Sequence, residues 1–123
     1  MVLQESGEMY LESILVLSRQ KDHVRSIDVC DYLGYSKPSV SRAMSLLRKN
    51  GFILMDSDNY ITLTESGSAV AEKIYERHQV LTKVLMSLGV DQQHATDDAC
   101  KIEHVISDAS FDAIKAHIRK HGE

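Results

Sequence analysis

Apolar side chains recur every three to four residues along most of the chain, a spacing that is typical of amphipathic helices. In the first part of the chain this pattern predicts helices over residues 7–20, 24–33 and 36–49. Gly34 is expected to end the second helix, because glycine adopts the left-handed conformation of a helix end without strain. Ser36 can cap the third helix, and Pro38 lies in its first turn, where a missing N–H is tolerated.

Two short apolar runs follow at residues 52–55 and 60–63, and the polar turn DSDN between them predicts a β-hairpin. Helical spacing then returns over residues 64–88, 92–106 and 109–121. Three helices followed by a hairpin is the order of a winged helix-turn-helix. We therefore predict a mainly α protein, with a winged helix-turn-helix DNA-binding domain at residues 1–65 and an all-helical domain at residues 66–123.

The distribution of charge along the chain changes which kind of binding partner is expected. The chain of 123 residues carries a net charge of −4, which by itself does not favour nucleic acid. Residues 19–49, however, hold seven basic and three acidic side chains, whereas the rest of the chain holds seven basic and fifteen acidic ones. This asymmetry indicates a local anion-binding face on an acidic body. The alternatives are an ordinary solvated surface or a winged helix that contacts proteins, and the serine-rich start of the third helix favours DNA.

A recognition helix reads base edges from its N-terminal turns. Arg42 is the main candidate for base reading, because arginine can grip a guanine edge through two hydrogen bonds. Pro38 can contact a thymine methyl group, whereas the serines and Lys37 are expected to fix the register on phosphates. The acidic turn at residues 56–59 is a poor phosphate clamp. The candidate DNA-binding residues are Arg25, Ser36, Lys37, Pro38, Ser39, Ser41 and Arg42.

A thiol, a carboxylate and an imidazole occur within five positions of the stretch CKIEHVISD. Cys100, Glu103 and His104 share one helical face, because positions i, i+3 and i+4 are neighbours there. Each residue alone is more often a packing or surface residue, but together they offer three kinds of donor to one ion. Further candidate donors are Met9, Glu12 and His78.

The chain has no apolar run long enough to cross a membrane, and residues 1–13 lack the features of an export signal. Its two cysteines, Cys30 and Cys100, are too few for a disulfide framework. We therefore expect a cytoplasmic protein whose thiols stay reduced, with no membrane partner and no organic substrate.

Four stretches of the chain carry a resemblance to a known family. They are GEMYLESILVL, YSKPSVSRAMSLLRKNGFI, LTESGSAVAEKIYERHQVL and DDACKIEHVISD, and they resemble the diphtheria-toxin-repressor family of iron- and manganese-responsive transcription regulators. The resemblance covers nearly the whole chain but not the third, SH3-like domain of longer members. It implies that the helical domain binds metal and dimerises, and that metal-loaded homodimers bind palindromic operator DNA and repress metal uptake.

The resemblance also implies a ligand set. Carried over by position, it is Met9, Cys100, Glu103 and His104, which is similar to the set of the iron-responsive branch. Glu12 matches a ligand of the manganese branch, and His78 matches a ligand of both. One metal site is therefore expected, and a second one through His78 and Glu12 stays open. Thr82 and Thr96 stand where iron-branch members carry further Glu and His ligands, and the nearby His94 is better interpreted as a surface residue.

The mixed sulfur, nitrogen and oxygen donors suit Fe²⁺, Co²⁺, Ni²⁺ or Zn²⁺ better than Mn²⁺, because sulfur is a soft donor. We expect Fe²⁺ as the cofactor in the cell, with Mn²⁺ second and Zn²⁺ third, and with Co²⁺ or Ni²⁺ as substitutes in vitro. Apolar residues near the end of the chain are candidates for a two-fold interface, the alternative being that they close the core of one subunit. They are Val105, Ile106, Phe111, Ile114 and Ile118.

Other functions compete with this interpretation. A winged-helix regulator that responds to an organic ligand or oxidant would use Cys100 as its switch, but the neighbouring Asp97 and Asp98 do not favour a thiolate. A metal-dependent hydrolase would need a motif such as His-Glu-x-x-His, which the sequence lacks, so no enzymatic activity is expected. A metal-storage module without DNA contact is the third alternative.

Overall fold

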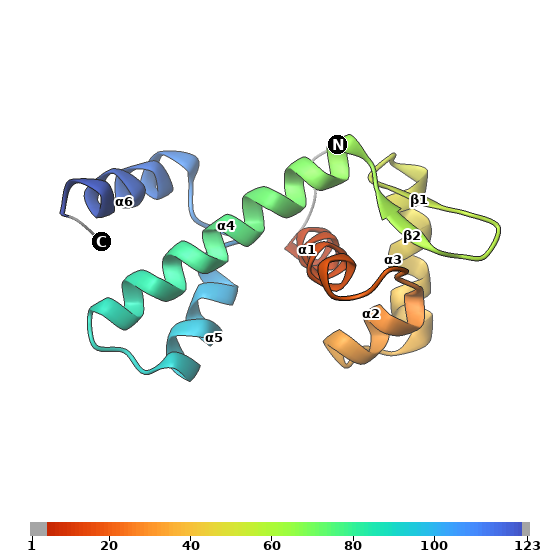
Figure 1. Ribbon diagram of the computed structural model, residues 1–123, viewed down its shortest axis with the longest axis horizontal. Coiled ribbons are helices and arrows are strands. Elements are labelled where there is room, and N and C mark those ends of the chain that lie inside the picture. Colours follow the sequence, from red (N-terminus) through yellow and green to blue (C-terminus); the bar gives the residue numbers. More distant parts are fainter. Residues whose placement is uncertain (1–4, 122–123) are drawn as a thin grey trace. The chain divides into compact units, whose positions relative to one another are not determined.

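The computed structural model describes residues 5–121, and in that range it contains six helices and one two-stranded sheet (Figure 1). The chain divides into two compact units, of which the first ends at Lys73 and the second begins at Ile74. Each unit is described by itself. No helix between residues 5 and 121 combines the length and the apolar character needed to cross a membrane.

The first unit is a winged helix-turn-helix, as the order of the elements predicts. It consists of α1 (Glu5–Gln20), α2 (Ser26–Leu33), α3 (Lys37–Lys49), β1 (Ile53–Met55), β2 (Ile61–Leu63) and the start of α4 (Glu65–Ser87). The three helices contact one another. In Figure 1 the hairpin, in light green, follows α3, in yellow. The strands pair antiparallel with Leu54 opposite Thr62. The largest fully buried side chains of this unit are Leu11, Ile14, Val29, Val40, Met44 and Ile53.

Local sequence signals fix the turn between α2 and α3. Gly34 adopts a left-handed φ of 73°, and its N–H donates to the carbonyl of Cys30 at 2.8 Å. The Ser36 hydroxyl accepts the Ser39 N–H at 3.3 Å, which satisfies one of the free N–H groups at the start of α3. The predicted roles of Gly34 and Ser36 are therefore confirmed.

A second glycine lets the start of α4 approach the hairpin. A Cβ at Gly67 would lie 2.0 Å from the carbonyl oxygen of Phe52, which is far inside van der Waals contact. The Thr64 hydroxyl donates to the carbonyl of Gly51 at 2.6 Å and accepts the Gly67 N–H at 3.1 Å. Glycine at this position thus permits a backbone approach that any larger residue would prevent.

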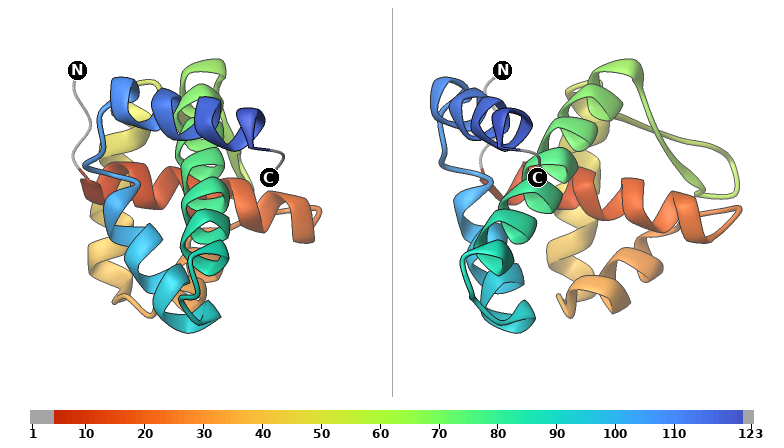
Figure 2. Two further views of the ribbon diagram at one scale, coloured as in Figure 1. Left: turned by 90° about the vertical axis from the view of Figure 1, so that its left-hand side faces the viewer. Right: turned by 60° about the vertical axis from the view of Figure 1, so that its left-hand side comes forward.

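The second unit contains the rest of α4, α5 (Gln92–Ile102) and α6 (Asp108–Lys120). The views of Figure 2 show α5, in cyan, alongside the C-terminal half of α4, in green. Helix α5 ends four residues before the predicted end, and Glu103–Ile106 form a turn. The core consists of Leu81, Ala99 and Phe111, with Val80, Ile102, Ile106 and Ile114 packed against it.

This core assigns one of the apolar residues near the end of the chain to the interior of one subunit. Phe111 is buried within the unit, whereas Ile106 and Ile114 pack against its cluster but are only half-buried. Val105 is 75% exposed and remains a candidate for contact with a second copy.

Candidate metal centre and DNA interface

The N-terminal turns of α3 present the predicted DNA-binding side chains to solvent. Lys37, Pro38, Ser41 and Arg42 are exposed, and Ser39 is half-buried. The Ser36 hydroxyl donates to the Ser39 hydroxyl at 2.9 Å, so both serines take part in the helix cap. Lys37, Ser41 and Arg42, together with the apolar ring of Pro38, take no part in this cap.

The exposed face of α3 extends beyond its N-terminal turns. A shallow groove on this helix is lined by Ser41, Arg42, Ser45, Leu46 and Lys49. Leu46 is 54% exposed, although leucine at helical spacing usually points into the core. Residues 42, 45, 46 and 49 follow the i, i+3, i+4, i+7 spacing of one face, a signal that could have found them.

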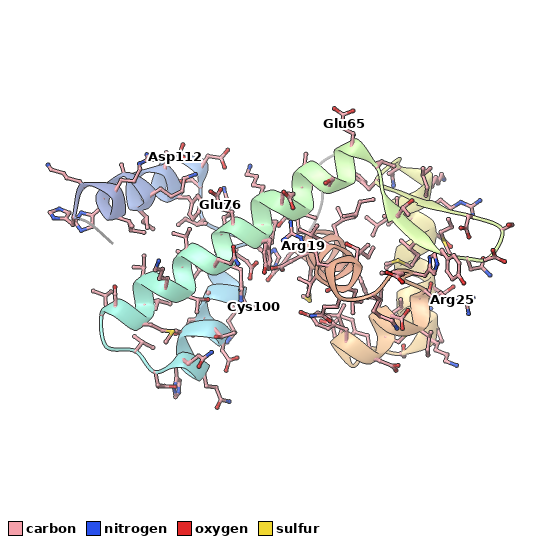
Figure 3. All side chains as sticks on the ribbon, viewed as in Figure 1. Arg19, Arg25, Glu65, Glu76, Cys100 and Asp112 are labelled. Atoms are coloured by element: carbon pink, nitrogen blue, oxygen red, sulfur yellow. The ribbon has the colours of Figure 1, made fainter. Side chains whose placement is uncertain are left out.

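Arg25 precedes α2 and is held by an aromatic contact that the sequence did not reveal. Its guanidinium carbon lies 4.7 Å from the centre of the Tyr60 ring, and its Nη2 donates to the Tyr60 hydroxyl at 3.3 Å. The His23 ring is stacked on Tyr60 with centroids 4.1 Å apart. Tyr60 thus contacts two exposed nitrogen-bearing side chains next to the turn of the hairpin. Arg25 is labelled in Figure 3.

The acidic tip of the hairpin has a structural reason. The Asp56 carboxylate accepts the N–H of Asp58 at 2.8 Å and the N–H of Tyr60 at 3.0 Å. Asn59 adopts a left-handed φ of 62°, which asparagine tolerates better than most residues. Asp56 therefore closes the turn, and its charge belongs to the hairpin rather than to a phosphate contact.

Four of the predicted metal ligands belong to the second unit. His78 lies on α4, Cys100 in the last turn of α5, and Glu103 and His104 in the turn that follows. The structure brings His78 and Glu103 together, with His78 Nδ1 3.0 Å from Glu103 Oε1. His104 is half-buried, whereas Cys100 is exposed and is labelled in Figure 3.

The Glu103 carboxylate is the unusual feature of this group. Its side chain is completely buried, and its Oε2 has no hydrogen-bond partner among residues 5–121. A buried carboxylate oxygen without a donor is costly, and a cation is one way to satisfy it. An imidazole follows it in sequence at His104 and a thiol lies three residues before it at Cys100, a combination that suits divalent transition metals. The residues present therefore fit such an ion.

The remaining two predicted ligands, Met9 and Glu12, lie on α1 in the first unit, and both are half-buried. The Tyr35 hydroxyl donates to the Met9 sulfur at 3.3 Å, which orients the thioether. The Tyr35 ring also packs edge-on against Tyr10, with centroids 6.0 Å apart. Burial raises the pKa of the Tyr10 hydroxyl, so this neighbour of Met9 stays neutral at physiological pH.

The two positions at which the resemblance implies further Glu and His ligands carry threonine in this chain. Thr82 on α4 and Thr96 on α5 offer only hydroxyl groups. The nearby His94 is exposed, and its Nδ1 lies 2.7 Å from Asp91 Oδ1. A hydrogen bond to Asp91 raises the pKa of His94, and the His94 N–H and side chain in turn lower the pKa of Asp91. His94 thus belongs to the cap of α5.

A winged helix with an exposed basic recognition helix, together with a helical unit that holds a buried carboxylate beside an imidazole group, is typical of a winged-helix regulator with a metal-binding unit. Residues 2–59 match the family described as "Iron dependent repressor, N-terminal DNA binding domain". Residues 64–122 match "Iron dependent repressor, metal binding and dimerisation domain". The chain belongs to the iron-dependent repressor family, whose members are metal-dependent transcriptional regulators, and the expected resemblance is confirmed.

Relatives described as transcriptional regulators match most of the chain. The transcriptional regulator MntR of Escherichia coli is 34% identical over 113 residues, which are 92% of this chain and 73% of the relative. An HTH-type transcriptional regulator of Methanocaldococcus jannaschii is 28% identical over 120 residues, and the match covers 96% of both chains. The match to the relative from M. jannaschii therefore covers both family regions of this chain.

Solved structures share the fold. One described as a manganese-dependent transcriptional repressor in complex with manganese is 27% identical, with a TM-score of 0.82 over 91% of this chain and 52% of that chain. The manganese regulator SloR has a TM-score of 0.82 at 23% identity over 97% of this chain and 55% of that chain. The chain thus spans about half the length of these two proteins.

Proposed function

We propose that this chain is a metal-dependent repressor that binds palindromic operator DNA as a homodimer and controls genes of metal homeostasis in the cytoplasm. The observation that carries the proposal is the buried Glu103 carboxylate, which has His78 on one oxygen and no partner among the described residues on the other. A chain that also carries an exposed basic recognition helix can use such a site to regulate DNA binding. We propose no enzymatic activity, membrane partner or organic substrate.

The proposed site would couple metal binding to DNA binding. When bound, the ion would supply a positive charge shared by its donors. It would order the side chains and the turn that hold it, which lowers the entropy cost of operator binding. A coupling of about 1–3 kcal/mol, which changes affinity about 5- to 150-fold, is enough for a switch. The proposed ligands are Met9, Glu12, His78, Cys100, Glu103 and His104.

We propose Fe²⁺ as the physiological ion, because two of the proposed donors, Met9 and Cys100, are sulfur atoms. Mn²⁺ is the second candidate, supported by relatives that are described as manganese regulators. Zn²⁺ ranks third in the cell, although it can bind more tightly than Fe²⁺ in vitro.

The proposed dimer contact is a groove between the end of α4 and α6, with a volume of about 500 Å³. A second copy of the chain is the proposed occupant, because the match to a dimerisation domain covers this region. Leu88, which lines the groove, is 75% exposed. Burying this side chain against a second copy would contribute hydrophobic stabilisation. The groove is lined by Lys83, Val84, Ser87, Leu88, Ala113, Ile114, His117, Ile118 and His121.

The test begins with anaerobic selection of a preferred duplex from a random DNA pool in the presence of Fe²⁺. Fluorescence anisotropy then gives the affinity for that duplex with Fe²⁺, Mn²⁺, Zn²⁺ or a chelator, all at one salt concentration. We expect chelation to weaken binding about 5- to 150-fold. Equal affinities with metal and with chelator would refute the proposal, and a selected duplex without two-fold symmetry would remove the dimer from it.

A further inference from the structure

Arg77 precedes the proposed ligand His78 on α4 and is buried, with 6% of its surface exposed. Its Nη1 donates to two backbone carbonyls, that of Glu103 at 3.2 Å and that of Ile106 at 2.7 Å. Its Nη2 donates to the carboxylate of Asp108 in the first turn of α6. A single guanidinium therefore holds both ends of the α5–α6 turn and the start of the next helix.

The turn needs these donors because α5 ends inside it. Ile102 is the last residue of α5, and its carbonyl already accepts the N–H groups of Val105 and Ile106. The carbonyls that follow have no further helical turn to supply their donors. Arg77 satisfies two of them, and buried carbonyls left without a donor would cost stability.

Two consecutive residues of α4 therefore hold Glu103, one at its backbone and one at its side chain. Arg77 holds its backbone carbonyl, and His78 holds its carboxylate. From this arrangement we infer that Arg77 is a positioning residue of the metal centre, which presets the ligand turn and links it to α6 through Asp108. The inference rests on the metal site of the proposed function, because it concerns the turn that carries Glu103 and His104.

The geometry requires an arginine. A guanidinium offers several N–H donors in one plane and can serve two carbonyls and a carboxylate together, whereas lysine is a point charge on a flexible stem. A role that depended only on positive charge would therefore survive Arg77→Lys. A role in fixing the backbone of the turn would not.

Lys115 provides a matched control on the same pair of helices. Its Nζ lies 3.2 Å from Glu76 Oε2, so it also joins α6 to α4 by an ion pair. It approaches the Phe111 ring at 5.4 Å, much as the Arg77 guanidinium does at 5.5 Å. No hydrogen bond from Lys115 to the α5–α6 turn occurs within residues 5–121. Lys115→Met thus removes a comparable link while leaving the ligand turn alone.

The experiment is an anaerobic titration of the full chain with Co²⁺, whose ligand-field absorption reports the geometry of its donors. We expect Arg77→Lys and Arg77→Met to weaken Co²⁺ binding about 10- to 100-fold, as the loss of an outer-shell partner typically does, and to shift the absorption bands. Lys115→Met should keep both the affinity and the spectrum. Wild-type affinity and spectrum in Arg77→Lys would overturn the inference while leaving the metal site intact. A wild-type chain without Co²⁺ absorption would overturn the metal site itself.

Asp108→Asn covers the case in which the Arg77 variants do not fold, because its side chain is 69% exposed. Hydrogen exchange of the Phe111 amide, which donates to the Ser107 carbonyl at 3.0 Å, reports on the first turn of α6. We expect Co²⁺ to slow this exchange in the wild-type chain and much less in Asp108→Asn. Equal slowing in both would show that the turn and α6 are not linked through Arg77.

Discussion

Replacing Glu103 by glutamine is expected to change the metal-free and metal-loaded proteins in opposite directions. Glutamine keeps the shape of the side chain and one oxygen for His78, but it removes a completely buried charge. An unsatisfied buried polar group costs about 1–3 kcal/mol, and a charged one costs more. The glutamine amide nitrogen would lack a hydrogen-bond partner just as Oε2 does. The substitution would therefore remove only the extra free-energy cost of a buried charge, and not the cost of an unsatisfied polar atom. We therefore expect Glu103→Gln to raise the metal-free stability by about 1 kcal/mol.

The metal-loaded protein should show the reverse order. An ion that binds only the folded state at 100 times its dissociation constant stabilises that state by about 2.7 kcal/mol. The wild-type chain should gain this amount with Fe²⁺, whereas Glu103→Gln, which lacks the anionic donor, should gain little. Urea unfolding followed by far-UV circular dichroism, with chelator and with Fe²⁺ under anaerobic conditions, measures both differences. A change in midpoint without a change in slope identifies a change in stability.

Glu76→Gln is the control, because this α4 carboxylate is 51% exposed and pairs with Lys115 at 3.2 Å. A surface pair contributes at most about 1 kcal/mol, so Glu76→Gln should change the metal-free stability little and should gain as much stability from Fe²⁺ as the wild type. A metal-free Glu103→Gln protein that is less stable than wild type by more than about 1 kcal/mol would show that the chain itself satisfies the carboxylate. Equal stabilisation of both proteins by Fe²⁺ would show that Glu103 is not a ligand.

Three further changes test other parts of the molecule. Arg42→Ala should cost about 1–3 kcal/mol in operator affinity and relax the base preference at one position, as measured by anisotropy on a set of duplex variants, whereas Arg48→Ala should weaken all sequences alike. Cys100→Glu should move metal preference toward Mn²⁺, and an unchanged order of Fe²⁺, Mn²⁺ and Zn²⁺ in competition titrations would contradict the proposed donor set. Gly67→Ala should destabilise the first unit by about 1–3 kcal/mol in urea unfolding because its Cβ would meet the Phe52 carbonyl at 2.0 Å, whereas the exposed Ser66→Ala should not.

The sequence predicted those parts of the fold whose causes are local. Gly34 and Ser36 act on backbone groups within a few residues, and so they locate the turn between α2 and α3 from the sequence alone. The end of α5 was predicted wrongly for the opposite reason. Ile102, Val105 and Ile106 keep helical spacing, but α5 ends at Ile102. The carbonyls of Glu103 and Ile106 accept donors from Arg77, which is 26 residues before Glu103 and which no local pattern reveals.

The candidate site was only partly predictable for the same reason. Residue types and spacing suggest donors at Cys100, Glu103 and His104, but burial depends on the tertiary structure. Glu103 is completely buried and Cys100 is exposed, although both were placed on one helical face. The contact of Arg25 with Tyr60 joins positions 35 residues apart, and no local pattern announces it.

Within four residues, the α5–α6 turn contains two kinds of hydrogen-bond acceptor that are satisfied differently. Its carbonyls at Glu103 and Ile106 receive donors from Arg77, whereas Oε2 of Glu103 has none among the described residues. None of the hydrogen bonds of the Arg77 guanidinium goes to that oxygen, which therefore remains open to a cation. A backbone that is fixed before an ion arrives lowers the ordering cost of binding for every ion alike. The affinity for metal should therefore depend on Arg77. The order of preference among metals should depend instead on the donor atoms of Met9 and Cys100. Mutations at these positions should therefore change affinity and preference separately.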